Sequence, residues 1–129
     1  MSARRQNKGV MAARIKKFIK YWLPVIIYAP LIFYLSSIPG KDVPQLFIGQ
    51  DILFHIIEYA ILALLINRAL KNYNPKLIYA RRFLWVFFVS IIYAASDEYH
   101  QMFVPGRCAS GFDLCIDGIG SLIGSLLYR

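Results

Sequence analysis

Four long apolar runs, separated by short polar connections, dominate the chain. They cover residues 21–38, 52–70, 83–103 and 112–128. Each run is close to the roughly 20 residues that a helix needs to cross the hydrocarbon core of a bilayer, and the last is at the short limit. The connections are too short to hold a second domain. The pattern therefore predicts an all-α protein, an integral membrane four-helix bundle.

Breaker residues mark the places where the runs end. Pro39 and the glycine after it end the first run, Pro75 follows an asparagine in the turn between the second and third, and Pro105 with its glycine ends the third. Composition agrees with membrane spans, because 58% of the 129 residues are hydrophobic and only 17% are charged. One small soluble core could not hide so much apolar surface, whereas lipid could.

The positions of Lys and Arg give the bundle an orientation. Nearly all of them precede the first run or surround the connection 71–82, while the connections 41–50 and 104–111 hold only Lys41 and Arg107. By the positive-inside rule, we expect both termini in the cytoplasm and these two poorly charged connections on the outer face.

This topology divides the chain into two parts. Residues 1–20 form a basic cytoplasmic arm, either interfacial or loosely ordered, and residues 21–129 form one four-span domain. The net charge of +8 might be taken to indicate nucleic acid. However, the basic clusters lie where the topology requires them and where they meet anionic headgroups. The expected partner is the lipid bilayer, with no nucleic acid; the oligomeric state is left open.

The polar residues of the runs gather at one depth, in the outer half of all four. By helical periodicity Asp51, His55 and Glu58 share an arc of about 60° on the second run. A charge at the bilayer centre costs roughly 3 kcal/mol or more, so such groups face the bundle interior or a wet cavity. We expect the inner halves to contain almost no polar groups. The outer cluster consists of Ser36, Ser37, Asp51, His55, Glu58, Asp97, Glu98, His100, Gln101, Arg107, Asp113 and Asp117.

These residues are assigned candidate roles by their chemistry. The acid/base groups that could be catalytic are His55, Glu58, Asp97 and Glu98. The groups that could bind a ligand are Arg107, Gln101, Asp113, Asp117 and Ser37. Neither an HExxH spacing nor a nucleophile elbow occurs. No motif therefore decides whether the protein binds a metal, binds a cofactor or catalyses a reaction.

Structural alternatives accompany several of these roles. Asp51 could only cap a helix, and His55 could only bond between helices. For His100 we favour a surface or packing role, and for Arg107 an ion pair or an anion-binding role. Gly120 and its partner four residues later fit a GxxxG motif, for which we favour close helix packing.

The ordered set of motifs resembles the VanZ-like family. The matching pieces are the segments 55–62 and 96–101, the Pro-Gly-Arg that ends at Arg107, and the following Asp113 and Asp117. The match covers residues 22–128. It implies a small multi-pass protein of the bacterial cytoplasmic (inner) membrane and a link to teicoplanin resistance, but it implies no established reaction.

Two functions follow as hypotheses. In the first, the outer polar pocket binds or acts on a lipid-linked cell-envelope component and lowers susceptibility to glycopeptides such as teicoplanin. In the alternative, the protein is an intramembrane enzyme, metal-assisted or acid/base, that acts on a polyprenyl-phosphate-type lipid. An ion or proton pathway is disfavoured, because the stretches 62–66 and 83–89 are apolar.

Overall fold

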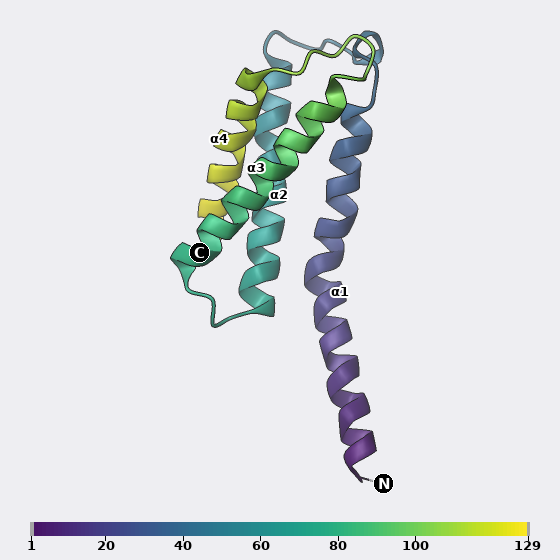
Figure 1. Cartoon of the computed structure of the whole chain (residues 1–129), viewed down its shortest axis with the longest axis vertical. Helices are drawn as coiled ribbons and strands as arrows, with labels where there is room; N and C mark the ends of the chain where they lie inside the picture. The colour runs from purple at the N-terminus through teal and green to yellow at the C-terminus, as the bar shows by residue number, and fades with distance from the viewer. Residues whose placement is uncertain (1, 129) are drawn as a thin grey trace.

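A computed structural model describes the backbone of residues 2–128 and the side chains of residues 7–128. The chain forms four α-helices and a short 3-10 turn, and no strand occurs in this described part. The prediction of an all-α protein with four helices is therefore confirmed (Figure 1). The elements are α1 (Ser2–Ser36), η1 (Gly40–Asp42), α2 (Gln50–Tyr73), α3 (Tyr79–Gln101) and α4 (Gly111–Leu127).

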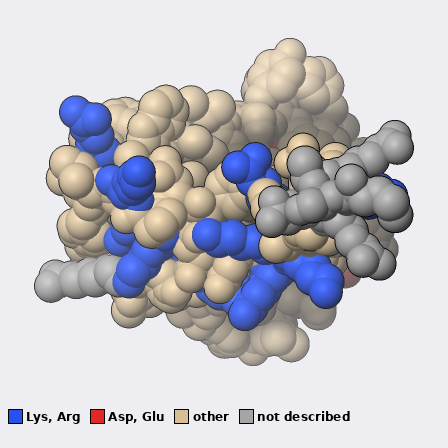
Figure 2. Space-filling view, turned by 90° about the horizontal axis from the view of Figure 1, so that it is seen from below, with Lys and Arg blue, Asp and Glu red and all other residues tan. Residues whose placement is uncertain are grey.

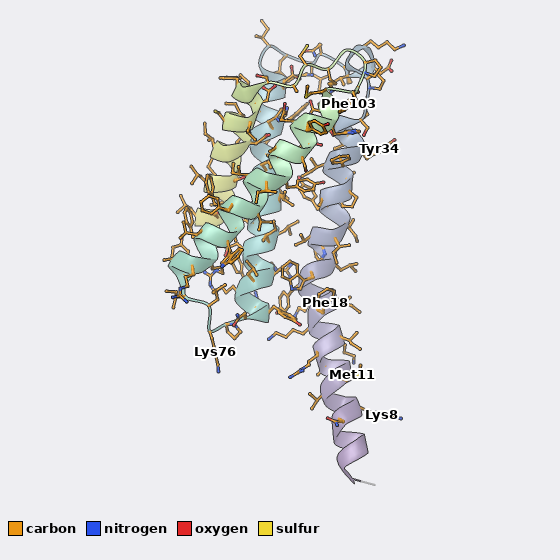
Figure 3. The ribbon with its side chains drawn as sticks, in the orientation of Figure 1. Lys8, Met11, Phe18, Tyr34, Lys76 and Phe103 are labelled. Atoms are coloured by element: carbon orange, nitrogen blue, oxygen red, sulfur yellow. The ribbon has the colours of Figure 1, made fainter. Side chains whose placement is uncertain are left out.

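Helix α1 runs without a break from the basic arm into the first apolar run. The alternative of a loosely ordered arm over residues 1–20 is wrong for residues 2–20, which are helical. The physical reason is that Ala, Arg, Lys and Gln, all good helix formers, fill this stretch, and Gly9 is its only glycine. The first part of α1 projects past the bundle, where Figure 3 labels Lys8 and Met11. The side chains of residues 1–6 lie outside the described part.

Helix α4 packs closely against α2 through two glycines. A Cβ added at Gly120 would overlap the carbonyl oxygen of Ile56, and one at Gly124 would overlap that of Ala60. Small residues at this spacing let two helix backbones approach each other. The GxxxG motif is thus confirmed as a packing motif, and the contact that it makes lies within one chain.

The polarity of the bundle is reversed relative to that of a soluble protein. Its exterior carries large exposed hydrophobic residues, among them Trp85 and Ile92 on α3 and Leu127 on α4. Two helical segments, Asn7–Ser36 and Gln50–Tyr73, are long and apolar enough to cross a membrane, and only 6% and 33% of their most apolar stretches are buried. Such exposed apolar surface supports association with a membrane.

Polar side chains are buried along more of the bundle than expected. The inner halves were expected to hold almost no polar groups, and this expectation is wrong. Asn67 is fully buried and accepts a hydrogen bond of 2.7 Å from the Nε of Arg82, which is itself buried. Asn67 also donates to the last carbonyls of α4, those of Ser125 and Tyr128. These groups are paired with one another, which offsets the cost of burying them.

Two connections, residues 37–49 and 102–110, meet at the same end of the bundle (Figure 1). The Gly40 amide donates a hydrogen bond of 3.0 Å to the carbonyl of Pro105. A Cβ on Gly40 would overlap the carbonyl oxygen of Gly106, whose own φ is 76°. We call this contact the glycine clasp. It fixes the position of the next residue, Arg107.

The opposite end of the molecule carries the α2–α3 connection and is basic. Figure 2 views the molecule from below and shows Lys and Arg side chains spread over this face. Lys76 lies at this end, whereas Tyr34 and Phe103 lie near the two clasped connections (Figure 3). The structure therefore separates a basic end from an end where the candidate polar residues gather.

Candidate functional site

A cavity of about 360 Å³ opens beside the glycine clasp, between the ends of the helices. One part of its wall is apolar and the other part is polar, with three acidic residues and Arg107. The helical face predicted for Asp51, His55 and Glu58 is confirmed, because all three line this one cavity. Its lining residues are Leu35, Ser36, Ile38, Asp42, Val43, Pro44, Asp51, Phe54, His55, Glu58, Gln101 and Arg107.

His55 and Asp117 form a bonded pair at the base of this region. The Nδ1 of His55 on α2 lies 2.8 Å from the Oδ1 of Asp117 on α4. Asp117 is 1% exposed and His55 is partly exposed toward the cavity. The carboxylate thereby orients the imidazole, and the one hydrogen bond of His55 among the described side chains is made by Nδ1.

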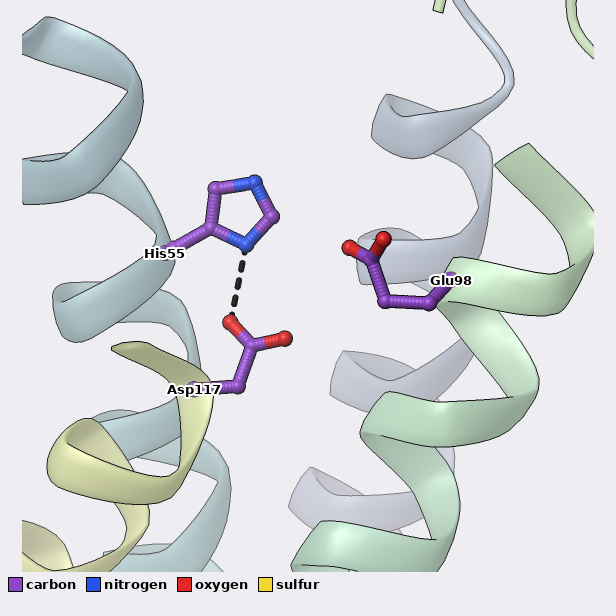
Figure 4. A group of neighbouring side chains, drawn as sticks. All are labelled: His55, Glu98 and Asp117. Atoms are coloured by element: carbon purple, nitrogen blue, oxygen red, sulfur yellow. Dashed lines mark hydrogen bonds and ion pairs between the residues drawn. The ribbon is translucent and has the colours of Figure 1, made fainter. Parts of the chain in front are cut away.

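Glu98 reaches this pair from a third helix. Figure 4 shows its carboxylate extending from α3 toward His55 and Asp117. One ligand atom from each of the three residues lies within 4.8 Å of the other two. The Oε2 of Glu98 accepts a hydrogen bond of 2.9 Å from the backbone amide of Ser110, at the N-cap of α4. Its Oε1 is buried and has no hydrogen-bond partner.

Asp97, the neighbour of Glu98, has a different environment. It is buried, its Oδ1 accepts a hydrogen bond of 2.6 Å from the hydroxyl of Ser36, and its Oδ2 accepts one of 3.2 Å from the Nε2 of Gln101. The bond to Gln101 lies within α3, where residues four positions apart share a face of the helix. Both oxygens of Asp97 thus have partners: Oδ1 joins α3 to α1, and Oδ2 is bonded within α3.

Arg107 caps the end of α1 rather than pairing with an acid. Its Nε donates to the carbonyl of Ile38 at 3.1 Å, and its Nη2 donates to that of Leu35 at 3.4 Å. These carbonyls carry the negative end of the helix dipole, which a cation stabilises. The ion pair considered from the sequence is therefore absent among the described residues, while the anion-binding role is untested. The guanidinium also lines the cavity.

Ser37 and His100 lie together, away from the main cavity. The Oγ of Ser37 is 2.9 Å from the Nε2 of His100, and the His100 ring stacks on Phe33 with centroids 4.3 Å apart. This is the packing role that we favoured for His100. Asp113 lines a smaller adjoining hollow that shares Asp51 and His55 with the main cavity. Ser37 was predicted to bind a ligand, but it does not line the main cavity, and its hydroxyl contacts His100 instead.

Several residues of the region were not predicted from the sequence. Gln50 is fully buried, where its side chain accepts from the amide of Leu46 at 2.6 Å and donates to the carbonyl of Pro44 at 2.7 Å. These two bonds hold the connection 37–49, part of which lines the cavity, against the start of α2. Tyr59 is fully buried, and its hydroxyl has no hydrogen-bond partner among the described residues. No short-range signal in the sequence marks either residue.

The resemblance stated from the sequence motifs is confirmed by comparison with family models. Residues 17–129 match the VanZ/LLP1 family, and the chain belongs to this family. Comparisons with curated proteins and with solved structures gave no match.

Proposed function

We propose that this chain is a multi-pass protein of the bacterial cytoplasmic membrane. In this proposal its cavity binds the headgroup of a lipid-linked cell-envelope component on the outer side, and binding lowers susceptibility to teicoplanin. The observation that carries the proposal is the cavity itself, which places a polar wall containing Arg107 directly beside an apolar wall.

The proposed topology has all four helices crossing the membrane, with both termini in the cytoplasm. The basic end seen in Figure 2 would face the cytoplasm and its anionic headgroups. Helix α4 has 17 residues, about 26 Å of helix, which is at the short limit for a span. Helix α3 is polar at both ends. Arg82 and Asp97 are buried there and Arg81 is exposed, while the middle of its exposed face, with Trp85, Phe88 and Ile92, is apolar.

The cavity suits a molecule that is part lipid and part headgroup. Its volume of about 360 Å³ lies within the usual range for small-ligand sites. The apolar wall, with Leu35, Ile38 and Phe54, would contact the first carbons of a lipid chain. A guanidinium is well suited to bind phosphate, and Arg107 keeps donors beyond the two that reach α1.

A second function, an intramembrane acid/base enzyme acting on a polyprenyl-phosphate-type lipid, is favoured by one observation. Asp117 holds the His55 ring, which also lines the cavity, and an imidazole oriented by a carboxylate is a common general base. Glu58 lines the same cavity.

Susceptibility of a host expressing the protein tests the resistance function. We expect the wild-type chain to raise the inhibitory concentration of teicoplanin, with vancomycin tested in parallel. Glu98→Gln and Arg107→Ala should abolish this protection at equal levels of inserted protein. Lys76→Ala, an exposed position at the opposite end of the bundle, is the matched control and should protect like the wild type. Absence of protection by the wild type would exclude the resistance function.

Direct binding separates the two candidate functions. The purified chain in lipid nanodiscs is titrated with a short-chain polyprenyl phosphate, and release of inorganic phosphate is followed in the same samples. Glu58→Gln removes a negative charge from the cavity without removing a hydrogen bond of the fold. A binding protein should therefore keep its affinity or bind more tightly. An enzyme that uses Glu58 should bind but lose turnover.

A further inference from the structure

Three residues from three different helices converge beside the cavity, which His55 lines: His55 of α2, Glu98 of α3 and Asp117 of α4 (Figure 4). Each contributes one ligand atom, and these atoms lie within 4.8 Å of one another. Glu98 and Asp117 are buried, and His55 is partly exposed to the cavity. Side chains that come from separate helices are held in place by the packing of the bundle, so their convergence does not depend on a flexible loop.

The Oε1 of Glu98 points independently to a ligand. Glu98 is 7% exposed, and this oxygen has no hydrogen-bond partner. Leaving a buried acceptor unpaired is costly, and native proteins rarely do so without a bound group. The other oxygen is anchored by the amide of Ser110, so the carboxylate is held in place, and one of its oxygens lies within 4.8 Å of a ligand atom of His55 and of Asp117.

The excess of negative charge around His55, Glu98 and Asp117 favours binding of a cation. Two buried carboxylates face one imidazole, and the basic residue in this region, Arg107, is directed at the carbonyls of α1. A buried carboxylate without a compensating charge is strongly disfavoured. A divalent cation would supply that charge, and it is often the largest local charge in such a site.

We infer that His55, Glu98 and Asp117 form a binding site for a divalent transition metal ion. A set of one imidazole nitrogen with carboxylate oxygens is typical of Zn²⁺ and similar ions, whereas Mg²⁺ and Ca²⁺ prefer oxygen ligands alone. Three protein ligands leave at least one coordination position open, as in catalytic zinc sites. Of the three residues, His55 also lines the cavity, so the metal site lies next to it.

The metal ion would also give a phosphate a partner in an acid-rich cavity. Asp42, Asp51 and Glu58 line the wall together with Arg107, and a phosphate alone would be repelled by these carboxylates. A metal ion with an open position would bind a phosphate oxygen directly. This last step rests on the proposed headgroup binding, whereas the metal site itself does not.

The test uses the full chain in nanodiscs, stripped of metal with EDTA and titrated with Zn²⁺ by calorimetry. Cys108 and Cys115 are free and exposed, so both are replaced by Ser in every sample to remove thiolate binding. We expect one Zn²⁺ per chain, counted by elemental analysis. Glu98→Gln and Asp117→Asn should each weaken binding by at least about tenfold, since even indirect partners of metal ligands contribute that much.

Asp97→Asn is the matched control for Glu98→Gln. It changes a carboxylate that is equally buried and adjacent in sequence but bonded to Ser36 and Gln101 instead. This variant should bind Zn²⁺ like the Cys-free parent protein. Size-exclusion profiles and helical circular dichroism show that each variant is folded, and Glu98→Gln keeps an oxygen for the Ser110 amide. Equal Zn²⁺ affinity in Glu98→Gln and the parent, or no binding by the parent, would overturn the site.

Lipid binding separates this inference from the proposed function. The titration with polyprenyl phosphate is repeated in EDTA and in saturating Zn²⁺, and we expect tighter binding with Zn²⁺. Equal binding in both would overturn the contact between metal and phosphate and leave the headgroup proposal standing. Zn²⁺ binding without any lipid binding would overturn the headgroup proposal and leave the metal site standing.

Discussion

The hydroxyl of Ser36 donates a hydrogen bond of 2.6 Å to the Oδ1 of Asp97, which lies 61 positions further along the chain. This bond ties the last turn of α1 to the buried face of α3. The second oxygen of Asp97 accepts from Gln101, so the carboxylate has protein partners on both sides. Its geometry distinguishes it from the neighbouring Glu98, which has a free oxygen.

Replacing Asp97 should therefore affect stability more than it affects the site. Asp97→Ala removes both bonds and should lower the free energy of unfolding by about 1–3 kcal/mol, the usual cost of leaving buried polar groups unpaired. Asp97→Asn keeps an acceptor for Ser36 and should cost less. Unfolding in mixed micelles, followed by Trp fluorescence, measures both values. An alanine variant as stable as the wild type would contradict a structural role for these bonds.

The close contact between α2 and α4 should not tolerate even one methyl group. Gly120→Ala and Gly124→Ala place a Cβ against backbone carbonyls that cannot rotate away, so each should destabilise the bundle by about 1–3 kcal/mol. Gly118→Ala on the same helix is the control, because its Cβ would meet only the end of the Ile91 side chain. The same unfolding assay applies. Equal effects at positions 118 and 124 would show that helix propensity, not helix contact, decides the outcome.

Asn67 should be essential for the packing of the basic end. It accepts from Arg82 and donates to two carbonyls at the end of α4, so Asn67→Ala leaves a buried guanidinium and two carbonyls short of partners. We expect a loss of about 1–3 kcal/mol in unfolding free energy. Asn74→Ala, at an exposed position in the turn after α2, should change stability little. Similar losses in the two variants would rule out this network as the cause.

Labelling of single cysteines from outside the cell should establish the topology. Cys108 is exposed in the connection that we place on the outer face, so a membrane-impermeant maleimide should label it in intact cells once Cys115 is replaced by Ser. A cysteine introduced by Lys76→Cys, in a chain without the two native cysteines, should react only after the cells are permeabilised. The reverse pattern would invert the protein in the membrane and place the cavity on the cytoplasmic side.

The helices themselves could be predicted because each one is a separate run of apolar residues bounded by breakers. The second run was predicted as 52–70 and is observed as Gln50–Tyr73, and the fourth as 112–128 and is observed as Gly111–Leu127. The start of α1 was missed because no breaker separates the basic arm from the apolar run. High helix propensity continues across that boundary.

The site was predicted in part. Helical periodicity identified the face shared by Asp51, His55 and Glu58, because those positions depend on one helix alone. The bond between His55 and Asp117 could not be foreseen, since it depends on the rotation of α4 relative to α2, which Gly120 and Gly124 help to set. Arg107 was predicted to pair with an acid or to bind an anion, whereas its observed partners are backbone carbonyls. Every residue has a backbone carbonyl, so the sequence cannot indicate which ones Arg107 contacts.

The glycine clasp has a consequence for how sequences of this kind can diverge. Two stretches of chain about 65 positions apart are in contact there. The contact is so close that a side chain at position 40 would overlap the carbonyl of Gly106. A substitution at position 40 would require a compensating shift at positions 105–106, and that shift would also move Arg107 off the end of α1. Substitutions in the two connections should therefore be coupled during evolution, although the connections are far apart in the sequence.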